Sequence, residues 1–347
     1  MQNFTPFDFH LIPAPLLSWY RANKRSLPWR ENPTPYRVWV SEIMLQQTRV
    51  EAVKEYYQRF MQALPDVEAL AECEEEKLLK LWEGLGYYSR VRNLQKAAKQ
   101  IVSFYGGVFP SDKQSLLSLP GIGSYTAGAI SSIAFHKPCP AVDGNVFRVA
   151  SRLEENPTPI SRPPYRKYLE SALEGVYPEE GIACAEFTQS LFELGALVCK
   201  PHAPECAICP LKEVCRAYQN GTQSLYPVMP KKIEKRHETV AVFLIETPEG
   251  WCIRRREEGV LKGMNEFPSA LLNEGDSPEK ILNEWGMYAF TEVKRQKYTH
   301  IFTHIRWEII CVWVRAESAP FDTYALAEIE EEISLPTAFK QCLGIVR

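Results

Sequence analysis

The chain has 347 residues, of which 45% are hydrophobic, and its formal net charge is −3. No apolar run of about 18 residues occurs, and residues 1–10 contain no basic stretch followed by an apolar one, so we expect neither a membrane span nor a secretion signal. Residues 1–222 hold 24 Lys+Arg and 24 Asp+Glu, and residues 223–347 hold 16 and 19. This balance excludes strong overall attraction to a polyanion, so any such affinity must come from local patches.

The first two thirds of the chain predict one helix after another. Apolar residues recur at spacings of three and four over residues 8–220, and Pro and Gly interrupt them. We therefore expect an all-α domain over residues 1–222. The segments with this periodicity are Leu16–Tyr20, Val38–Tyr57, Glu75–Leu85, Arg92–Tyr105 and Gln114–Leu119.

Two carboxylates lie in apolar surroundings. Glu42 is flanked by apolar residues within Val38–Thr48, and Asp143 follows Ala141-Val142. Apolar neighbours raise the pKa of a carboxyl group, and a glutamate that titrates near neutral pH can act as a general acid. The alternatives are a surface glutamate on an amphipathic helix and an aspartate that only caps a helix.

A tight turn between two helices is predicted at Pro120-Gly121-Ile122-Gly123, with the second helix beginning near Ser124. Glycine lets the backbone approach a ligand closely, and a helix N-terminus attracts phosphate. Pro120, Gly121 and Gly123 are thus a candidate phosphate-binding hairpin. An ordinary corner between helices is the alternative.

Four cysteines form a C-x6-C-x2-C-x5-C array: Cys199, Cys206, Cys209 and Cys215. Zinc knuckles usually come as paired C-x2-C units, whereas one C-x2-C with wider outer spacings suits a broader [4Fe-4S] cluster. Structural zinc is one alternative. Disulfides are another, and they would require an oxidising compartment.

The pattern changes after residue 222. Pro227, Pro230 and the basic run Lys231–Arg236 predict an extended linker over residues 223–237. Beyond it, strands at Val240–Ile245, Trp251–Arg254 and Ile305–Val314 surround a helix that begins at Ser277-Pro278 and ends at Gly286. We therefore expect an α+β domain over residues 238–347.

Glu42, the hairpin, Asp143 and the cysteine array, which follow one another in this order along the chain, resemble the helix–hairpin–helix DNA glycosylases of the endonuclease III superfamily. The match runs from Trp19 to Cys215 and is similar in particular to the MutY family of adenine glycosylases, through Leu27–Arg30, Glu42–Thr48, Gly84–Tyr88 and Asp143–Asn145. The resemblance implies a multi-domain chain: an all-α helix–hairpin–helix domain with a [4Fe-4S] loop at residues 199–215, followed by a Nudix-like (MutT-like) α+β domain.

The resemblance also implies a function. The chain would be a base excision repair enzyme that flips adenine, mispaired with 8-oxoguanine or guanine, out of duplex DNA and hydrolyses its N-glycosidic bond. Glu42 would protonate the base and Asp143 would stabilise the oxocarbenium-like sugar, with Tyr125 and Asn145 positioning them. The expected protein is a cytoplasmic, nucleoid-associated monomer that contacts DNA and no membrane.

The remaining site residues are implied in the same way. Trp29, Arg30 and Gln189 would line the adenine pocket. Gln47, Thr48 and Tyr87 would enter the duplex near the lesion. Phe302, Thr303 and His304 would read 8-oxoguanine, with threonine where the family has serine. Cys199, Cys206, Cys209 and Cys215 would hold the cluster.

Two departures from related enzymes narrow the expected activity. Lyase-active relatives carry lysine two residues after the last hairpin glycine, where this chain has Tyr125, and a phenol cannot form a Schiff base. We therefore expect a monofunctional glycosylase without strong lyase activity. The Nudix signature G-x5-E-x7-R-E-U-x-E-E-x-G-U is missing from residues 240–347, so we expect the fold without nucleotide hydrolysis. The alternatives are a thymine- or pyrimidine-directed glycosylase, an idle iron–sulfur DNA-binding protein and a nucleotide pyrophosphatase.

Overall fold

The computed structural model describes residues 6–160, 162–179, 181–230 and 234–346, and we refer to these as the described residues. The chain divides into two compact units. The first comprises Met1–Glu72 and Arg92–Lys231, and the second comprises Cys73–Val91 and Lys232–Arg347. Residues 231–233 of the predicted basic linker lie outside the described residues.

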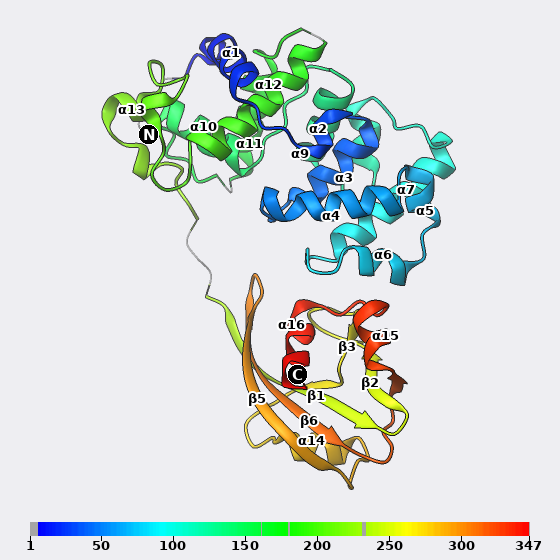
Figure 1. Cartoon of the computed structure of the whole chain (residues 1–347). Helices are drawn as coiled ribbons and strands as arrows, with labels where there is room; N and C mark the ends of the chain where they lie inside the picture. The colour runs from blue at the N-terminus through cyan, green and yellow to red at the C-terminus, as the bar shows by residue number, and fades with distance from the viewer. Residues whose placement is uncertain (1–5, 161, 180, 231–233, 347) are drawn as a thin grey trace. The chain divides into compact units, whose positions relative to one another are not determined.

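The first unit is built from helices, as the periodicity predicts (Figure 1). Its core gathers apolar side chains from the segment before α1 and from α10, α11 and α12, among them Phe9, Phe147, Leu169 and Phe187. Two π-helical segments, Ile130–Ala134 and Leu194–Val198, continue α9 and α12. The helices are α1 (Pro13–Asn23), α2 (Pro28–Glu31), α3 (Pro35–Leu45), α4 (Val50–Ala63), α5 (Val67–Glu72), α7 (Ser89–Tyr105), α8 (Lys113–Ser118), α9 (Ser124–Ala129), α10 (Gly144–Glu154), α11 (Pro163–Glu174), α12 (Ile182–Glu193) and α13 (Arg216–Asn220).

The periodic segment Val38–Tyr57 forms two helices and not one. Helix α3 ends at Leu45 and α4 begins at Val50. Between them Gln47 has φ 59°, in the left-handed region that ends a helix. The apolar spacing runs across the break because both helices bury one face in the same core, so periodicity alone could not reveal it.

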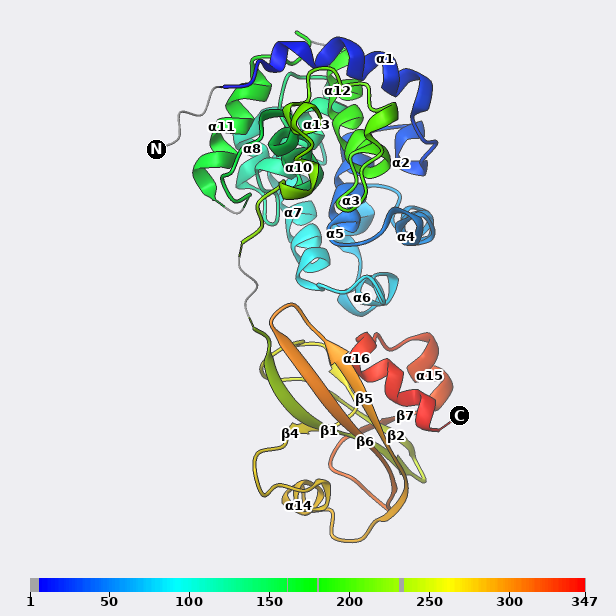
Figure 2. The ribbon, with the colours of Figure 1, turned by 90° about the vertical axis from the view of Figure 1, so that its left-hand side faces the viewer.

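The second unit contains a mixed sheet with helices on both faces. The central order is β3-β2-β1-β6-β5, with β4 paired to β1 and β7 paired to β2, and β1 runs parallel to β6. Figure 2 shows α14 and the α15–α16 pair on opposite sides of this sheet. The elements are β1 (Arg236–Thr247), β2 (Gly250–Arg255), β3 (Asn265–Glu266), β4 (Ser269–Leu271), α14 (Pro278–Glu284), β5 (Thr291–Ile301), β6 (Ile305–Arg315), β7 (Asp322–Tyr324), α15 (Leu326–Glu331) and α16 (Thr337–Lys340).

The second unit also includes a segment from the middle of the helical region. Residues 73–91, which carry α6 (Glu75–Leu81), are grouped with it. The Lys80 ammonium donates to the carbonyls of Glu330 (2.7 Å) and Ile333 (3.0 Å), and the Ser334 hydroxyl donates to Leu79 O (3.1 Å). The sequence-based ranges 1–222 and 238–347 assign this segment to the first domain instead.

The sequence analysis did not predict strand β5. Its residues are almost all exposed along the edge of the sheet, so they lack the alternation that marks a half-buried strand. Among the described residues, no helix combines the length and the apolar character needed to cross a membrane.

Candidate active site

One cavity of about 1060 Å³ in the first unit gathers the predicted catalytic and adenine-pocket residues. Helices α3, α9, α10 and α12 and the loop after α3 supply its walls. The predicted residues that line it are Trp29, Arg30, Glu42, Gln47, Thr48, Tyr125, Asp143, Asn145 and Gln189.

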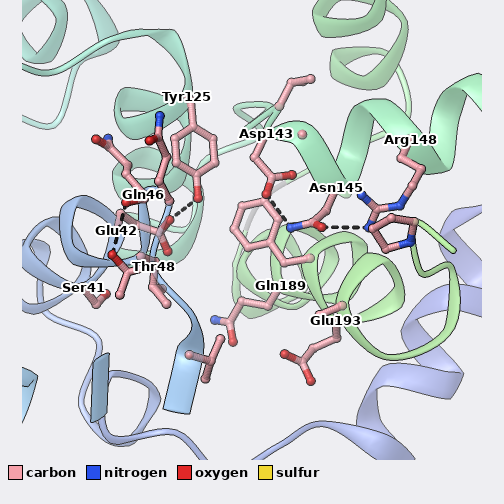
Figure 3. Close-up of a pocket in the computed structure, with 18 of the residues that line it drawn as sticks. Ser41, Glu42, Gln46, Thr48, Tyr125, Asp143, Asn145, Arg148, Gln189 and Glu193 are labelled. Atoms are coloured by element: carbon pink, nitrogen blue, oxygen red, sulfur yellow. Dashed lines mark hydrogen bonds between the residues drawn. The ribbon is translucent and has the colours of Figure 1, made fainter. Parts of the chain in front are cut away.

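Glu42 is buried in this cavity, which excludes the surface glutamate that the sequence left open. It is 5% exposed, and burial raises the pKa of its carboxyl to about 7. The Tyr125 hydroxyl donates a hydrogen bond to Glu42 Oε2 and, with the more distant Arg30, opposes this increase in the pKa (Figure 3). The charge of Asp143 adds to it. Glu42 is therefore poised to hold a proton near neutral pH.

Asp143 is the N-cap of α10, as its position predicts, and it also faces the cavity. Its Oδ1 accepts from the Val146 amide (2.8 Å), and its Oδ2 accepts from the Asn145 side chain (2.7 Å). Burial raises the pKa of the Asp143 carboxyl, and these hydrogen bonds oppose the increase. Figure 3 shows Glu42 and Asp143 entering the pocket from different elements.

Asn145 continues a chain of hydrogen bonds away from the cavity. Its Oδ1 accepts from the Arg148 guanidinium (2.8 Å), which also donates to the carbonyls of Gly195 (2.9 Å) and Cys199 (2.7 Å). The carboxylate of Asp143 is thereby connected to the start of the cysteine loop.

The opposite wall carries a carboxylate that sequence analysis missed. Glu193 is fully buried and accepts from Arg25 (2.6 Å) and Arg30 (2.9 Å). Burial favours a higher pKa for Glu193, but the two arginines outweigh it and hold the pKa below its ordinary value. The available signal was a glutamate four residues after Gln189 on one helix, which is too common to identify a site.

Trp29 and Gln189 complete the wall on this side. Trp29 is buried and meets the Tyr57 ring edge-on at 5.6 Å. The side-chain oxygen of Gln189 accepts from the Tyr20 hydroxyl at 2.6 Å. The pocket thus offers an aromatic face, an amide and an anionic acceptor to a ligand.

The predicted hairpin is present, although its residues do not line the cavity. Gly121 has φ +78°, and a Cβ there would approach the Asn93 Cβ to 2.8 Å, so both conformation and space require glycine. Gly123 is the N-cap of α9, and nothing lies within 4 Å of the position where its Cβ would be. The backbone at Gly123 is open to a ligand.

Tyr87 and the 302–304 segment belong to the second unit. Tyr87 has φ 47° and is 49% exposed, and its hydroxyl lies 3.0 Å from Thr303 Oγ1. Phe302, Thr303 and His304 form the turn between β5 and β6, closed by a hydrogen bond from Phe302 N to Ile305 O (2.8 Å). Thr303 and His304 are exposed at this turn, whereas the Phe302 ring packs on Trp307 at 4.8 Å.

The four cysteines of the array line one small cavity, together with Arg152. The Arg152 guanidinium donates to Cys199 Sγ (3.3 Å) and to the carbonyls of Lys200 (2.7 Å) and Pro201 (3.0 Å). Within the described ranges, no three His, Cys, Asp or Glu side chains gather closely enough to hold a single metal ion. The four thiols thus share one cavity.

Comparisons with known proteins identify the family of the chain. Residues 40–175 match the family model of the HhH-GPD superfamily base excision DNA repair proteins, and residues 241–344 match that of the NUDIX domain. The adenine DNA glycosylase of Mus musculus is 34% identical over 89% of this chain and 71% of its own length. That of Buchnera aphidicola (subsp. Baizongia pistaciae) is 34% identical over 86% of this chain and 84% of its own.

Three other proteins are also similar to this chain. The adenine DNA glycosylase of Arabidopsis thaliana is 38% identical over 88% of this chain, which spans 57% of that relative. Among solved structures, a thermostable thymine-DNA glycosylase is similar with a TM-score of 0.55 and 28% identity, over 60% of this chain and 96% of the other. A non-covalent endonuclease III–DNA complex shares the fold, with 24% identity and a TM-score of 0.51; the match covers 61% of this chain and 95% of the other.

Proposed function

The chain belongs to the adenine DNA glycosylase family within the HhH-GPD superfamily, and from this premise we propose that it excises adenine mispaired with 8-oxoguanine or guanine in duplex DNA. The observation that carries the proposal is the shared cavity of Glu42 and Asp143, one carboxyl with a pKa of about 7 and one fixed at a helix N-terminus. An acid and an anion on one cavity suit the cleavage of a glycosidic bond.

The pocket walls complement adenine. The base has an exocyclic amino group that donates and ring nitrogens that accept. Glu193 supplies an acceptor and the Gln189 amide supplies N–H donors, while Trp29 offers an aromatic face. A base inside the DNA duplex must be extruded before it can react. The cavity volume of about 1060 Å³ leaves room for such an extruded nucleotide.

The chemistry follows from the protonation states. Protonated Glu42 transfers its proton to a ring nitrogen of adenine, so that the base leaves as a neutral molecule when the bond from C1′ to N9 breaks. The sugar becomes cationic at this point, and the ionised Asp143 stabilises it until water adds to C1′. Tyr125 holds Glu42, and Asn145 holds Asp143.

The same residues argue against strand cleavage by the protein. Lyase chemistry requires an amine that attacks C1′, and Tyr125 occupies the position after the hairpin where related lyases carry lysine. We therefore expect a base-free site in an intact strand. The exposed Thr303 and His304 at the β5–β6 turn are the proposed contacts to 8-oxoguanine.

The residues of the cysteine array fit a [4Fe-4S] cluster. Cys199, Cys206, Cys209 and Cys215 line one cavity, and Arg152 would offset part of the negative charge of four thiolates. Such a cluster would cross-link residues 199–215 and hold their shape. Cys199→Ser should then reduce bound iron and sulfide together with DNA affinity, and unchanged DNA binding by iron-free protein would contradict this structural role.

A single-turnover assay tests the proposal. Duplexes with adenine opposite 8-oxoguanine or guanine should lose adenine, and the strand should break only after alkali treatment. Matched duplexes with thymine or an oxidised pyrimidine test the thymine-directed alternative, to which the solved thymine-DNA glycosylase draws attention. Release of a pyrimidine but not of adenine, or strand cleavage without alkali, would refute the proposal.

A further inference from the structure

Tyr20 contacts two residues that line the cavity and has no part in the chemistry proposed above. It lies on α1, is 2% exposed and is not among the residues that line the cavity. Its hydroxyl donates to Gln189 Oε1 over 2.6 Å, and its ring centre lies 6.0 Å from the Arg30 guanidinium carbon. Two residues of the pocket wall therefore rest against one buried phenol.

The hydrogen bond occupies the oxygen side of the Gln189 amide and leaves its nitrogen side available to a ligand. A carboxamide has an acceptor oxygen on one side and two N–H donors on the other. Because Tyr20 occupies the oxygen, the donors remain for the cavity. Figure 3 shows Gln189 between Glu42 and Glu193, where the amide would meet a bound base.

An amide without this partner could turn over. Rotation about its last bond exchanges oxygen and nitrogen at little cost, since the two ends have nearly the same shape. The exchanged amide would present an acceptor to the ring nitrogens of adenine, which are themselves acceptors. The base would then be held less well while the sugar–base bond is cleaved.

We propose that Tyr20 is a positioning residue for base excision: its hydroxyl locks the Gln189 amide with both donors facing the extruded base. The proposal rests on the excision of adenine proposed above. The Tyr20 hydroxyl acts through Gln189, because it is turned toward the amide oxygen.

The test uses the full chain and the substitution Tyr20→Phe, which removes only the hydroxyl. We expect the single-turnover rate of adenine excision to fall about three- to tenfold, the usual effect of losing one orienting hydrogen bond. Duplex affinity and the pH profile of the rate should not change, because the phosphate contacts and Glu42 are untouched. Single-turnover rates at saturating enzyme do not depend on the folded fraction, so a loss of stability cannot imitate this result.

Two further variants make the test specific. Tyr57→Phe removes another buried hydroxyl near the cavity, one with no hydrogen-bond partner in the described part of the chain, and should leave the rate unchanged. In a Gln189→Ala background, Tyr20→Phe should have no further effect, since the group that it positions is gone.

The possible outcomes separate cleanly. A rate loss in the wild-type background that vanishes in the Gln189→Ala background supports the proposal. A Tyr20→Phe rate equal to that of the wild type overturns it, and so does an equal loss in both backgrounds, which would indicate a merely structural role. Failure of the wild-type chain itself to release adenine would instead refute the proposed function, and this inference with it.

Discussion

Glu42 keeps its proton near neutral pH because apolar neighbours exclude water from its carboxyl. Its pKa of about 7 predicts an excision rate that is level below this pH and falls about tenfold per pH unit above it, where the acid form is lost. Single-turnover rates from about pH 6 to pH 9 would check this slope.

Glu42→Gln should lower the excision rate on the plateau below pH 7 by about 10²–10⁴-fold. A wild-type rate for this variant would show that another group donates the proton.

The same proton links pH to stability. The native chain holds it up to a pH of about 7, whereas the unfolded chain releases it near the ordinary value of 4.5. The native state therefore binds more protons between these values, and this group makes the free energy of unfolding fall as the pH rises through the interval.

Tyr125→Phe should move the pH profile in a defined direction. The Tyr125 hydroxyl stabilises the ionised form of Glu42 and so lowers its pKa. Without this hydroxyl the pKa rises further, and the alkaline fall in rate should begin at higher pH. Tyr57→Phe, which removes a hydroxyl that makes no described hydrogen bond, is the matched control. A shift to lower pH would contradict this assignment of the hydrogen bond.

Sequence analysis identified two of the three carboxylates on the cavity because each of these two has apolar neighbours in the chain. Glu42 and Asp143 were recognisable for this reason, and the structure places them on one cavity. Glu193 and Tyr20 were not, since their importance depends on partners more than 160 residues away, Arg25 for Glu193 and Gln189 for Tyr20. Local patterns cannot reveal such pairs.

Among the elements, the π-helical segment after α12 has a direct effect on the site. A Cβ on Gly195 would approach the Asn145 Cβ to 2.6 Å. Gly195→Ala should therefore displace Asn145, break its hydrogen bonds to Asp143 and Arg148, and cost about 1–3 kcal/mol of stability as overpacking usually does. Thermal unfolding together with single-turnover rates would measure both effects.

Gly175→Ala is the control for this substitution. Gly175 ends α11 with φ −68°, and the nearest atom to its Cβ position lies 3.8 Å away, so alanine should fit without strain. Equal losses of stability and rate for both variants would show that the contact with Asn145 is not the cause.

Elements with one buried face were predictable, and exposed or interrupted ones were not. The helix at Ser277–Gly286 has proline in its first turn and glycine after its end, and the structure contains α14 there. The break at Gln47 is hidden because the apolar spacing continues across it, and the edge strand β5 lacks an apolar alternation because it is exposed. To predict either of them, one must know which surfaces the other elements of the fold bury.

At the level of the whole molecule, catalysis and the proposed reading of the opposite base lie in different units. Thr303→Ala combined with His304→Ala should reduce the preference for adenine opposite 8-oxoguanine over adenine opposite guanine, because the two side chains are exposed at the β5–β6 turn. The rate on adenine opposite guanine should change little, as the carboxylates are untouched. Competition between the two duplexes would measure the ratio, and an unchanged ratio would count against this role for the turn.

Asp143 has two roles, as the N-cap of α10 and as an anion on the cavity, and this has a consequence for variants at this position. The carboxylate both begins α10 and faces the cavity, and asparagine is an equally good residue with which to begin a helix. Asp143→Asn should therefore give a chain that keeps the N-cap of α10 and still binds duplex DNA but excises adenine much more slowly, because it loses the anion that faces the cavity and the hydrogen bond from Asn145. Such a chain would compete with the active enzyme for the mispair, and a screen for misfolded variants would not detect it.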